Sequence, residues 1–418
     1  MKNRRSDSSF SDTKSNFFFK YYREVIIDMT SKWLKFIAVI LCGCLAFGFS
    51  GCDGDEEDSS DGSSGITEEE VNVIKVGYIF HGSAEKGGFT GQINDQRLSA
   101  SKYCNGKVES YYIENVSVSD FESAVKALYS EGCEVIISCS SIYTNILSSI
   151  AGRYMNIEFI NYGSLGIGTA NVTSYVETYY QGSYIGGMIA AYNSKTEKIG
   201  FVADGDMLGI YPTVNAATLG MQRVYKNAEM CVVGATADNE IEDAIDALIA
   251  YGCDVIICYT ESKHSAEYCE KKGVKFVGGL DYSLYEEDYP NMIMYFYSKR
   301  DSYFLKKFKE LQYEDWDTSP YIGAMANGII NVSEALSAAK EDSQKLIDYI
   351  APLVTSGQLY IFSGEIKDTG GNVRYMQGDS LSENEIFGLS WYFQGVTVIG
   401  NFRKPHENTT QNDFKVKS

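Results

Sequence analysis

Two stretches of the chain, 120 residues apart, share one pattern that decides the fold. Residues 121–141 read FESAVKALYSEGCEVIISCSS, and residues 241–261 read IEDAIDALIAYGCDVIICYTE. Each begins with apolar residues at helical spacing, continues through Gly-Cys and an acidic residue, and then has an uninterrupted Val-Ile-Ile run. This pattern is typical of a helix, a tight turn and a strand buried on both faces of a parallel sheet. Each stretch is therefore predicted to be half of an α/β repeat.

The match extends in both directions along the chain. Upstream, residues 75–79 (KVGYI) parallel residues 198–202 (KIGFV), and downstream, residues 157–161 (IEFIN) parallel residues 274–278 (VKFVG). Three matches in the same order exceed coincidence. Each half then reads strand, loop, helix, strand, helix, strand, helix, strand. The sequence therefore predicts an α/β protein with two Rossmann-like, doubly wound lobes whose strand ends and loops face a common crevice.

The chain continues past the second repeat, and its last elements predict how the lobes are joined. Residues 299–350 are predicted to be mainly helical, with residues 327–336 (NGIINVSEAL) as the clearest amphipathic stretch. Residues 359–364 (LYIFSG) are predicted to form a strand, and residues 368–372 (DTGGN) a hairpin-type loop. These extra elements indicate a hinge in which the chain crosses between the lobes more than once.

The predicted lobe boundaries follow from the repeat and the extra elements. The first lobe is expected to comprise residues 71–187 with about 300–355, and the second residues 188–299 with about 356–400. Residues 401–418 are left as a C-terminal tail. The part of the chain after residue 70, roughly 345 residues, also exceeds what one hydrophobic core usually serves, which favours two lobes.

The N-terminal 70 residues have the pattern of an exported, lipid-anchored protein. Residues 36–49 (FIAVILCGCLAFGF) are apolar or glycine throughout, and these fourteen residues suit a signal peptide but fall short of the about 20 that a membrane span needs. Ser50, Gly51 and Cys52 follow and resemble the lipobox of bacterial lipoproteins, in which the cysteine receives lipid and becomes the mature N-terminus. Residues 1–51 are thus expected to be a signal segment, although Met29 could be the true start.

An acidic, Ser/Gly-rich stretch follows Cys52 at residues 53–70 (DGDEEDSSDGSSGITEEE). It has almost nothing to bury, so it is expected to be a disordered tether. The folded part is therefore predicted to lie on the extracytoplasmic face of the cell membrane, held there by its lipid. The alternative is a plain secretory signal with an incidental cysteine.

Composition excludes several classes of function. The net charge is −20 for the whole chain, and removing the +4 of residues 1–51 leaves −24, which argues against nucleic-acid binding because that requires a basic face. The seven cysteines after Cys52 are odd in number and form no CxxC motif, so they are expected to be small core residues. The three histidines are scattered. We expect no metal site, no disulfide framework and no cofactor.

Four stretches resemble, in their order along the chain, the basic membrane protein family of PnrA-like ABC transporter substrate-binding lipoproteins. They are residues 87–97 (GGFTGQINDQR), 179–201 (from YYQGSYIGGMIAA to KIGF), 214–220 (VNAATLG), and the pair 362–374 (FSGEIKDTGGNVR) and 391–396 (WYFQGV). The resemblance covers about residues 72–400. It implies a type I periplasmic-binding-protein fold and, most often, purine nucleoside uptake with an ABC permease as partner.

The resemblance also assigns three ligand-binding residues. Phe89 falls on the family's aromatic that stacks on the base of the ligand, an attraction worth roughly 1–3 kcal/mol. Asn94 stands where near relatives commonly have Asp. Asp281 matches the acidic residue that holds ribose hydroxyls or base nitrogens, and a carboxylate that accepts two hydroxyls is a natural sugar clamp.

Further candidates come from the ends of the predicted strands, where doubly wound folds bind ligands. Asn215 lies in a loop-to-helix turn expected to face the crevice. The strand-end candidates are Ser140, Ser141 and Tyr143 in the first lobe, and Tyr259, Thr260 and Glu261 in the second.

The leading hypothesis is a monomeric binding protein that closes around one small molecule and docks to a permease. The alternative is a surface lipoprotein that senses a ligand without transport, and neighbouring genes for an ATPase and permeases or for a kinase would separate the two. An enzyme is not expected. Residues 163–168 (GSLGIG) follow a fourth strand rather than the first and lack the acidic partner of a dinucleotide site. No Asp/Glu pair is placed with a base or nucleophile.

Replacing either Phe89 or Asp281 by Ala is predicted to weaken nucleoside binding at least about tenfold, which is near 1.4 kcal/mol, because each change removes a direct ligand contact. Titration calorimetry measures the affinity. Thermal unfolding should show that both variants still fold. Unchanged affinity in both variants would contradict the assignment.

Overall fold

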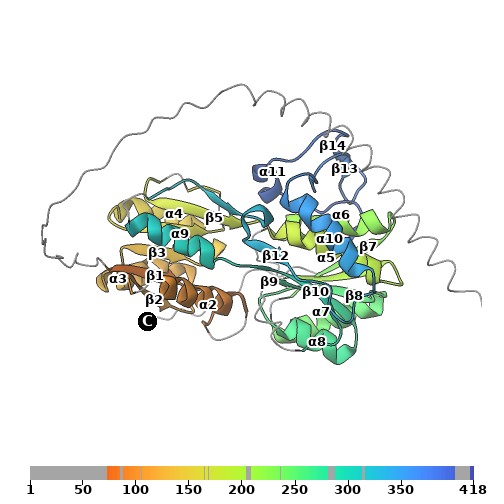
Figure 1. Ribbon diagram of the computed structural model, residues 1–418, viewed down its shortest axis with the longest axis horizontal. Helices are drawn as coiled ribbons and strands as arrows, with labels where there is room; N and C mark the ends of the chain where they lie inside the picture. The colour runs from red at the N-terminus through yellow and green to blue at the C-terminus, as the bar shows by residue number, and fades with distance from the viewer. Residues whose placement is uncertain are drawn as a thin grey trace, which may run out of the picture. The chain divides into compact units, whose positions relative to one another are not determined.

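The computed structural model describes residues 73–84, 88–104, 106–163, 165–167, 169–203, 209–235, 237–280, 288–312, 316–400 and 415–418. The predicted signal segment, Cys52, the tether and Asp281 lie outside the described residues. Within these residues, two mainly parallel sheets with helices on their faces confirm the predicted two-lobed α/β class (Figure 1).

The first sheet belongs to the first lobe, and its strands run in the order β11-β5-β4-β3-β1-β2, with every pair parallel. Its strands are β1 (Ile74–Ile79), β2 (Val108–Ile113), β3 (Val135–Ser138), β4 (Glu158–Tyr162), β5 (Val172–Glu177) and β11 (Tyr321–Gly323). The accompanying helices are α2 (Gly88–Tyr103), α3 (Phe121–Ser130), α4 (Thr144–Ile150) and α9 (Asp301–Gln312).

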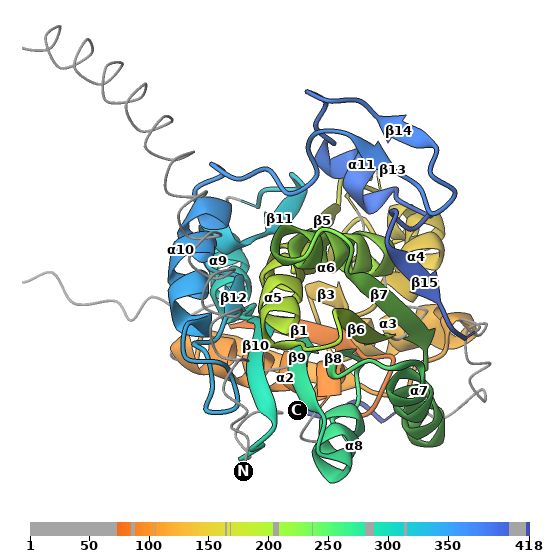
Figure 2. The ribbon, with the colours of Figure 1, turned by 90° about the vertical axis from the view of Figure 1, so that its right-hand side faces the viewer.

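The second sheet has the order β12-β10-β9-β8-β6-β7-β15, and within it β12 is antiparallel to β10. Its strands are β6 (Lys198–Ala203), β7 (Glu229–Gly234), β8 (Val255–Tyr259), β9 (Lys275–Leu280), β10 (Met292–Ser298), β12 (Ile330–Val332) and β15 (Val396–Val398). Its helices are α5 (Tyr179–Asn193), α6 (Ile210–Val224), α7 (Asp238–Tyr251), α8 (His264–Lys272) and α10 (Ser343–Thr355). Figure 2 shows β15 beside β7.

The repeat that decides the fold has the predicted structure in both lobes. Residues 121–141 form α3 and β3, and residues 241–261 form α7 and β8, with both strands fully buried. Gly132 and Gly252 have φ of +86° and +103°, the left-handed conformation that ends a helix tightly and that glycine adopts without steric cost.

A second glycine pair explains the upstream match of the repeat. A Cβ on Gly77 of β1 would lie 2.7 Å from Leu128 of α3, and one on Gly200 of β6 would lie 3.0 Å from Leu248 of α7. Each glycine therefore leaves room for the leucine that the repeat helix buries against the sheet. Burying such a side chain stabilises a fold by roughly 1.5–3 kcal/mol.

Three chain crossings join the lobes. They lie between β5 and α5, between β10 and α9, and between β11 and β12 (Figure 1). Backbone hydrogen bonds tie the crossings to one another, because the amide of Thr178 donates to Gly323 at 2.8 Å and that of Lys299 donates to Ile329 at 2.8 Å. The predicted multi-crossing hinge is present.

The C-terminal third differs from the prediction in two places. The predicted amphipathic helix over residues 327–336 is wrong, because Gly328 turns the chain at φ +75° and Ile330 begins strand β12, which pairs with β10. The predicted strand over residues 359–364 is also wrong. Only Ser363 makes a β-bridge there, to Ser380, and the chain turns at Gly364 with φ +90°.

The loop over residues 368–372 does connect an antiparallel hairpin, β13 (Ile366–Lys367) with β14 (Val373–Tyr375). Asp368 holds the turn, since its carboxylate accepts the amides of Gly370 at 2.9 Å and Asn372 at 3.0 Å. Helix α11 (Glu383–Phe387) accompanies the hairpin (Figure 2).

The structure also differs from the predicted lobe boundary within residues 300–355. Helix α9 and strand β11 go with the first sheet, but β12 joins the second sheet and α10 packs on α5. The physical reason is the third crossing, which returns the chain to the second lobe at residues 324–329. Within the described residues, no helix is both long and apolar enough to cross a membrane.

Helices α5 and α6 cross at two glycines. A Cβ on Gly187 would lie 2.1 Å from the carbonyl oxygen of Ala217, and one on Gly220 would lie 2.0 Å from that of Tyr184. Backbone therefore packs directly on backbone in the second lobe. This contact accounts for Gly187, whereas a Cβ on Gly182 of the same helix would instead meet Phe296 of β10 at 2.7 Å.

Gly187→Ala is predicted to lower the stability of the protein by roughly 1–3 kcal/mol, because the added methyl group forces the two helices apart. Denaturant unfolding should show a lower midpoint. Gly152→Ala is the control, since a Cβ there meets no atom within 4 Å. Equal midpoints for the two variants would contradict the packing argument.

Candidate ligand-binding site

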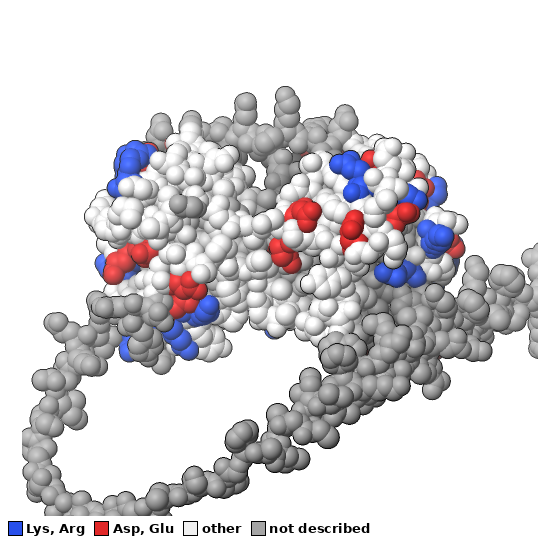
Figure 3. All heavy atoms as spheres, turned by 90° about the horizontal axis from the view of Figure 1, so that it is seen from above, with Lys and Arg blue, Asp and Glu red and all other residues white. Residues whose placement is uncertain are grey.

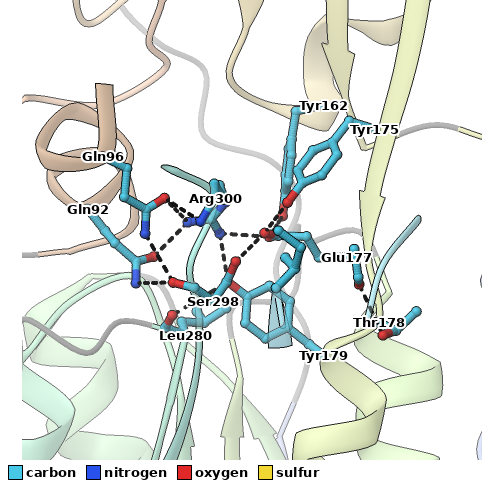
Figure 4. Close-up of polar contacts among 12 residues, drawn as sticks. Gln92, Gln96, Tyr162, Tyr175, Glu177, Thr178, Tyr179, Leu280, Ser298 and Arg300 are labelled. Atoms are coloured by element: carbon cyan, nitrogen blue, oxygen red, sulfur yellow. Dashed lines mark hydrogen bonds and ion pairs between the residues drawn. The ribbon is translucent and has the colours of Figure 1, made fainter. Parts of the chain in front are cut away.

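The candidate site lies where the carboxyl ends of first-lobe strands meet the hinge. Tyr162 ends β4, Glu177 ends β5, and Arg300 follows Ser298 at the end of β10. Figure 4 shows these side chains converging with Tyr179, the first residue of α5. Because the ends of parallel strands are where doubly wound folds bind ligands, this junction is the candidate site.

Arg300 is the centre of the junction, and its side chain is 1% exposed. Its Nη2 donates to Glu177 and to the Tyr179 hydroxyl, each at 2.7 Å, and its Nη1 donates to Gln92 at 2.8 Å and to Gln96 at 3.4 Å. A guanidinium has five N–H donors. The fifth, at Nε, is buried and has no hydrogen-bond partner among the described residues.

The carboxylate of Glu177 is fully hydrogen-bonded. One oxygen accepts from the Tyr175 hydroxyl at 2.7 Å and from Ser298, and the other accepts from Tyr162 at 3.0 Å and from Arg300. A carboxylate that has lost its water shell needs such partners, because an unpaired buried charge is costly. Both oxygens of the Glu177 carboxylate therefore accept hydrogen bonds, whereas one N–H group of Arg300, at Nε, has no acceptor among the described residues.

The guanidinium of Arg300 and the phenols of the junction are held in their ordinary protonation states. Burial by itself lowers the pKa of Arg300, but Glu177 and the surrounding tyrosines more than offset this and raise it well above its usual value. Burial raises the pKa of Tyr162, Tyr175 and Tyr179 well above the usual value for a phenol. All three tyrosines therefore remain hydrogen-bond donors at any physiological pH.

Phe89, the aromatic predicted to stack on a base, lies at this junction. It is the second residue of α2 and is buried, with the Arg300 guanidinium 4.8 Å from its ring centre and the Tyr162 ring 5.4 Å away. Two glutamines of the same helix clamp it to the hinge, because Gln92 and Gln96 both donate to the carbonyl of Ser298, at 3.2 and 3.0 Å. The position of Phe89 is thus coupled to the second crossing.

The second lobe contributes Tyr259 and the segment before Asp281. Tyr259 ends β8, and its ring meets that of Tyr179 edge-on at 5.8 Å. The Tyr179 hydroxyl donates a long hydrogen bond, 3.5 Å, to the carbonyl of Leu280. Leu280 has φ +76°, a conformation that is costly for leucine and that tends to persist at functional sites. Asp281, the next residue, lies outside the described residues.

Two predicted site residues, Tyr143 and Asn215, make packing contacts or hydrogen bonds within their own lobes. The Tyr143 side chain is fully buried in the first-lobe core, stacked on Phe121 at 4.6 Å, and its hydroxyl donates to Val116 at 2.5 Å. Asn215 holds the C-terminal segment, donating to Trp391 at 3.0 Å and accepting from Phe393 at 2.9 Å. The structure does not bring these two side chains to the junction.

The remaining predicted residues shape the loops around it. Thr260 bonds Ser265 at 2.9 Å in the turn before α8, Asn94 accepts from Arg97 at 2.9 Å, and Ser140 caps the helical turn 141–143. Ser141 packs against Gly163, and Glu261 is exposed on the second lobe, facing the start of α2.

Sequence reasoning missed Glu177, Arg300, Gln92, Gln96 and Tyr179. The available signal was a charged residue at the end of two apolar strands, Glu177 at the end of residues 172–177 and Arg300 just after residues 292–298. Because the sequence does not show that Glu177 and Arg300 form a pair, each could not be distinguished from a charged residue in a surface loop.

The structure is a two-lobed α/β frame with three chain crossings and a buried polar junction at the strand ends of the first lobe. Solved ABC transporter solute-binding proteins share this fold. One from Aeropyrum pernix K1 has a TM-score of 0.60 at 15% identity, covering 75% of this chain and 95% of that chain. One from Conexibacter woesei DSM 14684 has a TM-score of 0.55 at 14% identity, covering 69% and 98%.

The chain belongs to the Bmp family, described as PnrA-like ABC transporter substrate-binding proteins, which matches residues 73–294. It is also similar to a purine-binding protein of Brucella abortus (strain 2308), with 25% identity over 329 residues, which cover 77% of this chain and 93% of that protein. The family resemblance read from the sequence is confirmed.

Glu177→Gln is predicted to destabilise the protein by roughly 3–5 kcal/mol, because it leaves the buried Arg300 without a counter-charge. Denaturant unfolding measures the change. Lys345→Gln is the control, since its ion pair with Asp342 is largely exposed and its loss should leave the midpoint unchanged. A Glu177 variant as stable as the control would contradict the assigned role.

Proposed function

We propose that this protein is the extracytoplasmic substrate-binding lipoprotein of an ABC importer and that it captures a purine nucleoside or free purine by hinge closure. The observation that carries the proposal is the junction itself. It places an aromatic ring, a buried guanidinium and a set of protonated tyrosines at the strand ends of a two-lobed fold. The similarity to a purine-binding protein over nearly all of that protein's length supports the same ligand class.

The chemistry of the junction suits a flat, acceptor-rich ligand. The ring of Phe89 provides a stacking surface, and stacking of a base on an aromatic side chain is worth roughly 1–3 kcal/mol. The unpaired Nε–H of Arg300 is a buried donor, and purines present ring nitrogens and exocyclic oxygens as acceptors. Because an unsatisfied buried donor costs about 1–3 kcal/mol, a ligand acceptor at this position would add affinity.

Asp281 is proposed to bind the ribose hydroxyls from the second lobe. Its neighbour Leu280 is buried, held at positive φ, and in contact with Tyr179, which also bonds Arg300. The first-lobe contact at Phe89 and the second-lobe contact at Asp281 would thus be joined through one hydrogen-bonded chain. Closure on a ligand would then engage both lobes together.

The cellular setting is a proposal from the N-terminal sequence. Cys52 would carry the lipid, residues 53–70 would tether the folded part, and a permease in the same membrane would receive the ligand. On the face drawn in Figure 3, basic and acidic side chains are dispersed and form no continuous basic patch. Metabolic labelling with a fatty acid should mark the wild type but not Cys52→Ser.

Titration calorimetry with adenosine, guanosine, inosine and free purines, and with ribose and glucose as controls, tests the ligand class. At least one purine should bind at least about tenfold more tightly than either sugar, because a sugar lacks the stacking contribution. Phe89→Leu, which keeps apolar bulk but removes the ring, should shrink that difference. Tighter binding of a sugar than of every purine would overturn the proposal.

A further inference from the structure

Gly88, the first residue of α2, lies so close to the second lobe that a side chain would not fit there. It has φ +77°, and a Cβ built on it would lie 2.6 Å from the backbone carbonyl oxygen of Glu261. Cβ contacts under 3.0 Å are essentially never seen. The backbones of the two lobes approach so closely here because Gly88 has no side chain.

The two residues belong to different lobes and lie beside the candidate site. Gly88 precedes Phe89 in the first lobe, and Glu261 follows β8 and Thr260 in the second. The contact is separate from the three crossings. If the lobes rotate about those crossings, the distance between the backbones of Gly88 and Glu261 is set by how far the lobes have closed.

We propose that the contact between Gly88 and Glu261 is a closure stop, and that Gly88 sets how closely the lobes can approach. Gly88 is a positioning residue, because it touches the opposite lobe rather than the ligand. The inference rests on the proposed function, since closure around a ligand is what gives the stop its purpose. A methyl group at this position would hold the lobes apart, so fewer molecules would be in the closed, binding-competent state. The apparent affinity for the ligand falls in proportion to the fraction of molecules in that state.

The chain offers a matched control for the test. Gly88→Ala has two effects, strain at positive φ and a clash with the carbonyl of Glu261. Gly106, in the same lobe, has the same φ of +77°, and a Cβ there meets no atom within 4 Å. Gly106→Ala therefore carries the backbone strain without the clash, and the difference between the two variants isolates the clash.

Calorimetry with the tightest-binding nucleoside gives the first readout. Gly88→Ala should bind at least about tenfold more weakly than Gly106→Ala, while the two melting temperatures fall by similar amounts. Equal affinities for the two variants would overturn the proposal.

Gly88→Ala could also weaken binding by displacing the neighbouring Phe89 without affecting closure. Small-angle X-ray scattering distinguishes this explanation from a closure stop. With saturating nucleoside, wild type and Gly106→Ala should contract, and Gly88→Ala should remain more extended. A displaced Phe89 would weaken affinity but leave the contraction at saturation intact, and that result would overturn the proposal.

If the wild type binds no nucleoside, the proposed ligand fails, and scattering from the ligand-free proteins still decides the stop. A larger radius of gyration for Gly88→Ala than for Gly106→Ala would support it. Equal radii would contradict it.

Discussion

The buried ion pair between Glu177 and Arg300 is the interaction on which the rest of the structure depends. Glu177 ends the strand that leads into the first crossing, and Arg300 follows the strand that leads into the second. The free energy lost when two charges leave water exceeds the free energy gained from their attraction, unless hydrogen bonds satisfy their remaining donors and acceptors. Here the carboxylate accepts four hydrogen bonds, and four of the five guanidinium donors are used. The pair therefore holds two chain crossings in one fixed arrangement.

This arrangement connects the candidate ligand contacts to the hinge. On the first-lobe side, Gln92 and Gln96 bind the hinge from the helix that carries Phe89. On the second-lobe side, Tyr179 bonds both Arg300 and the strained Leu280 that precedes Asp281. A ligand that contacts either side would therefore act on the same polar network. Such coupling is what a binding protein needs if its two lobes are to close as one step.

Local pattern was sufficient to predict the fold, but not the polar junction. The repeat of residues 121–141 and 241–261 predicted helix, turn and strand in both lobes, because apolar spacing and left-handed glycines act over short distances. Phe89 was placed through the family resemblance. Glu177 and Arg300 are 123 residues apart, and their pairing is a product of the tertiary fold. The burial of Tyr143, whose ring stacks on Phe121, is likewise a product of the tertiary fold.

Native mass spectrometry of the protein as purified, with identification of any small molecule released on unfolding, tests the central claim most directly. We predict one bound molecule per chain, identified as a purine nucleoside or a free purine, and its loss from a variant in which Phe89 is Ala. Release of a sugar or an amino acid instead, in one-to-one stoichiometry, would contradict the account.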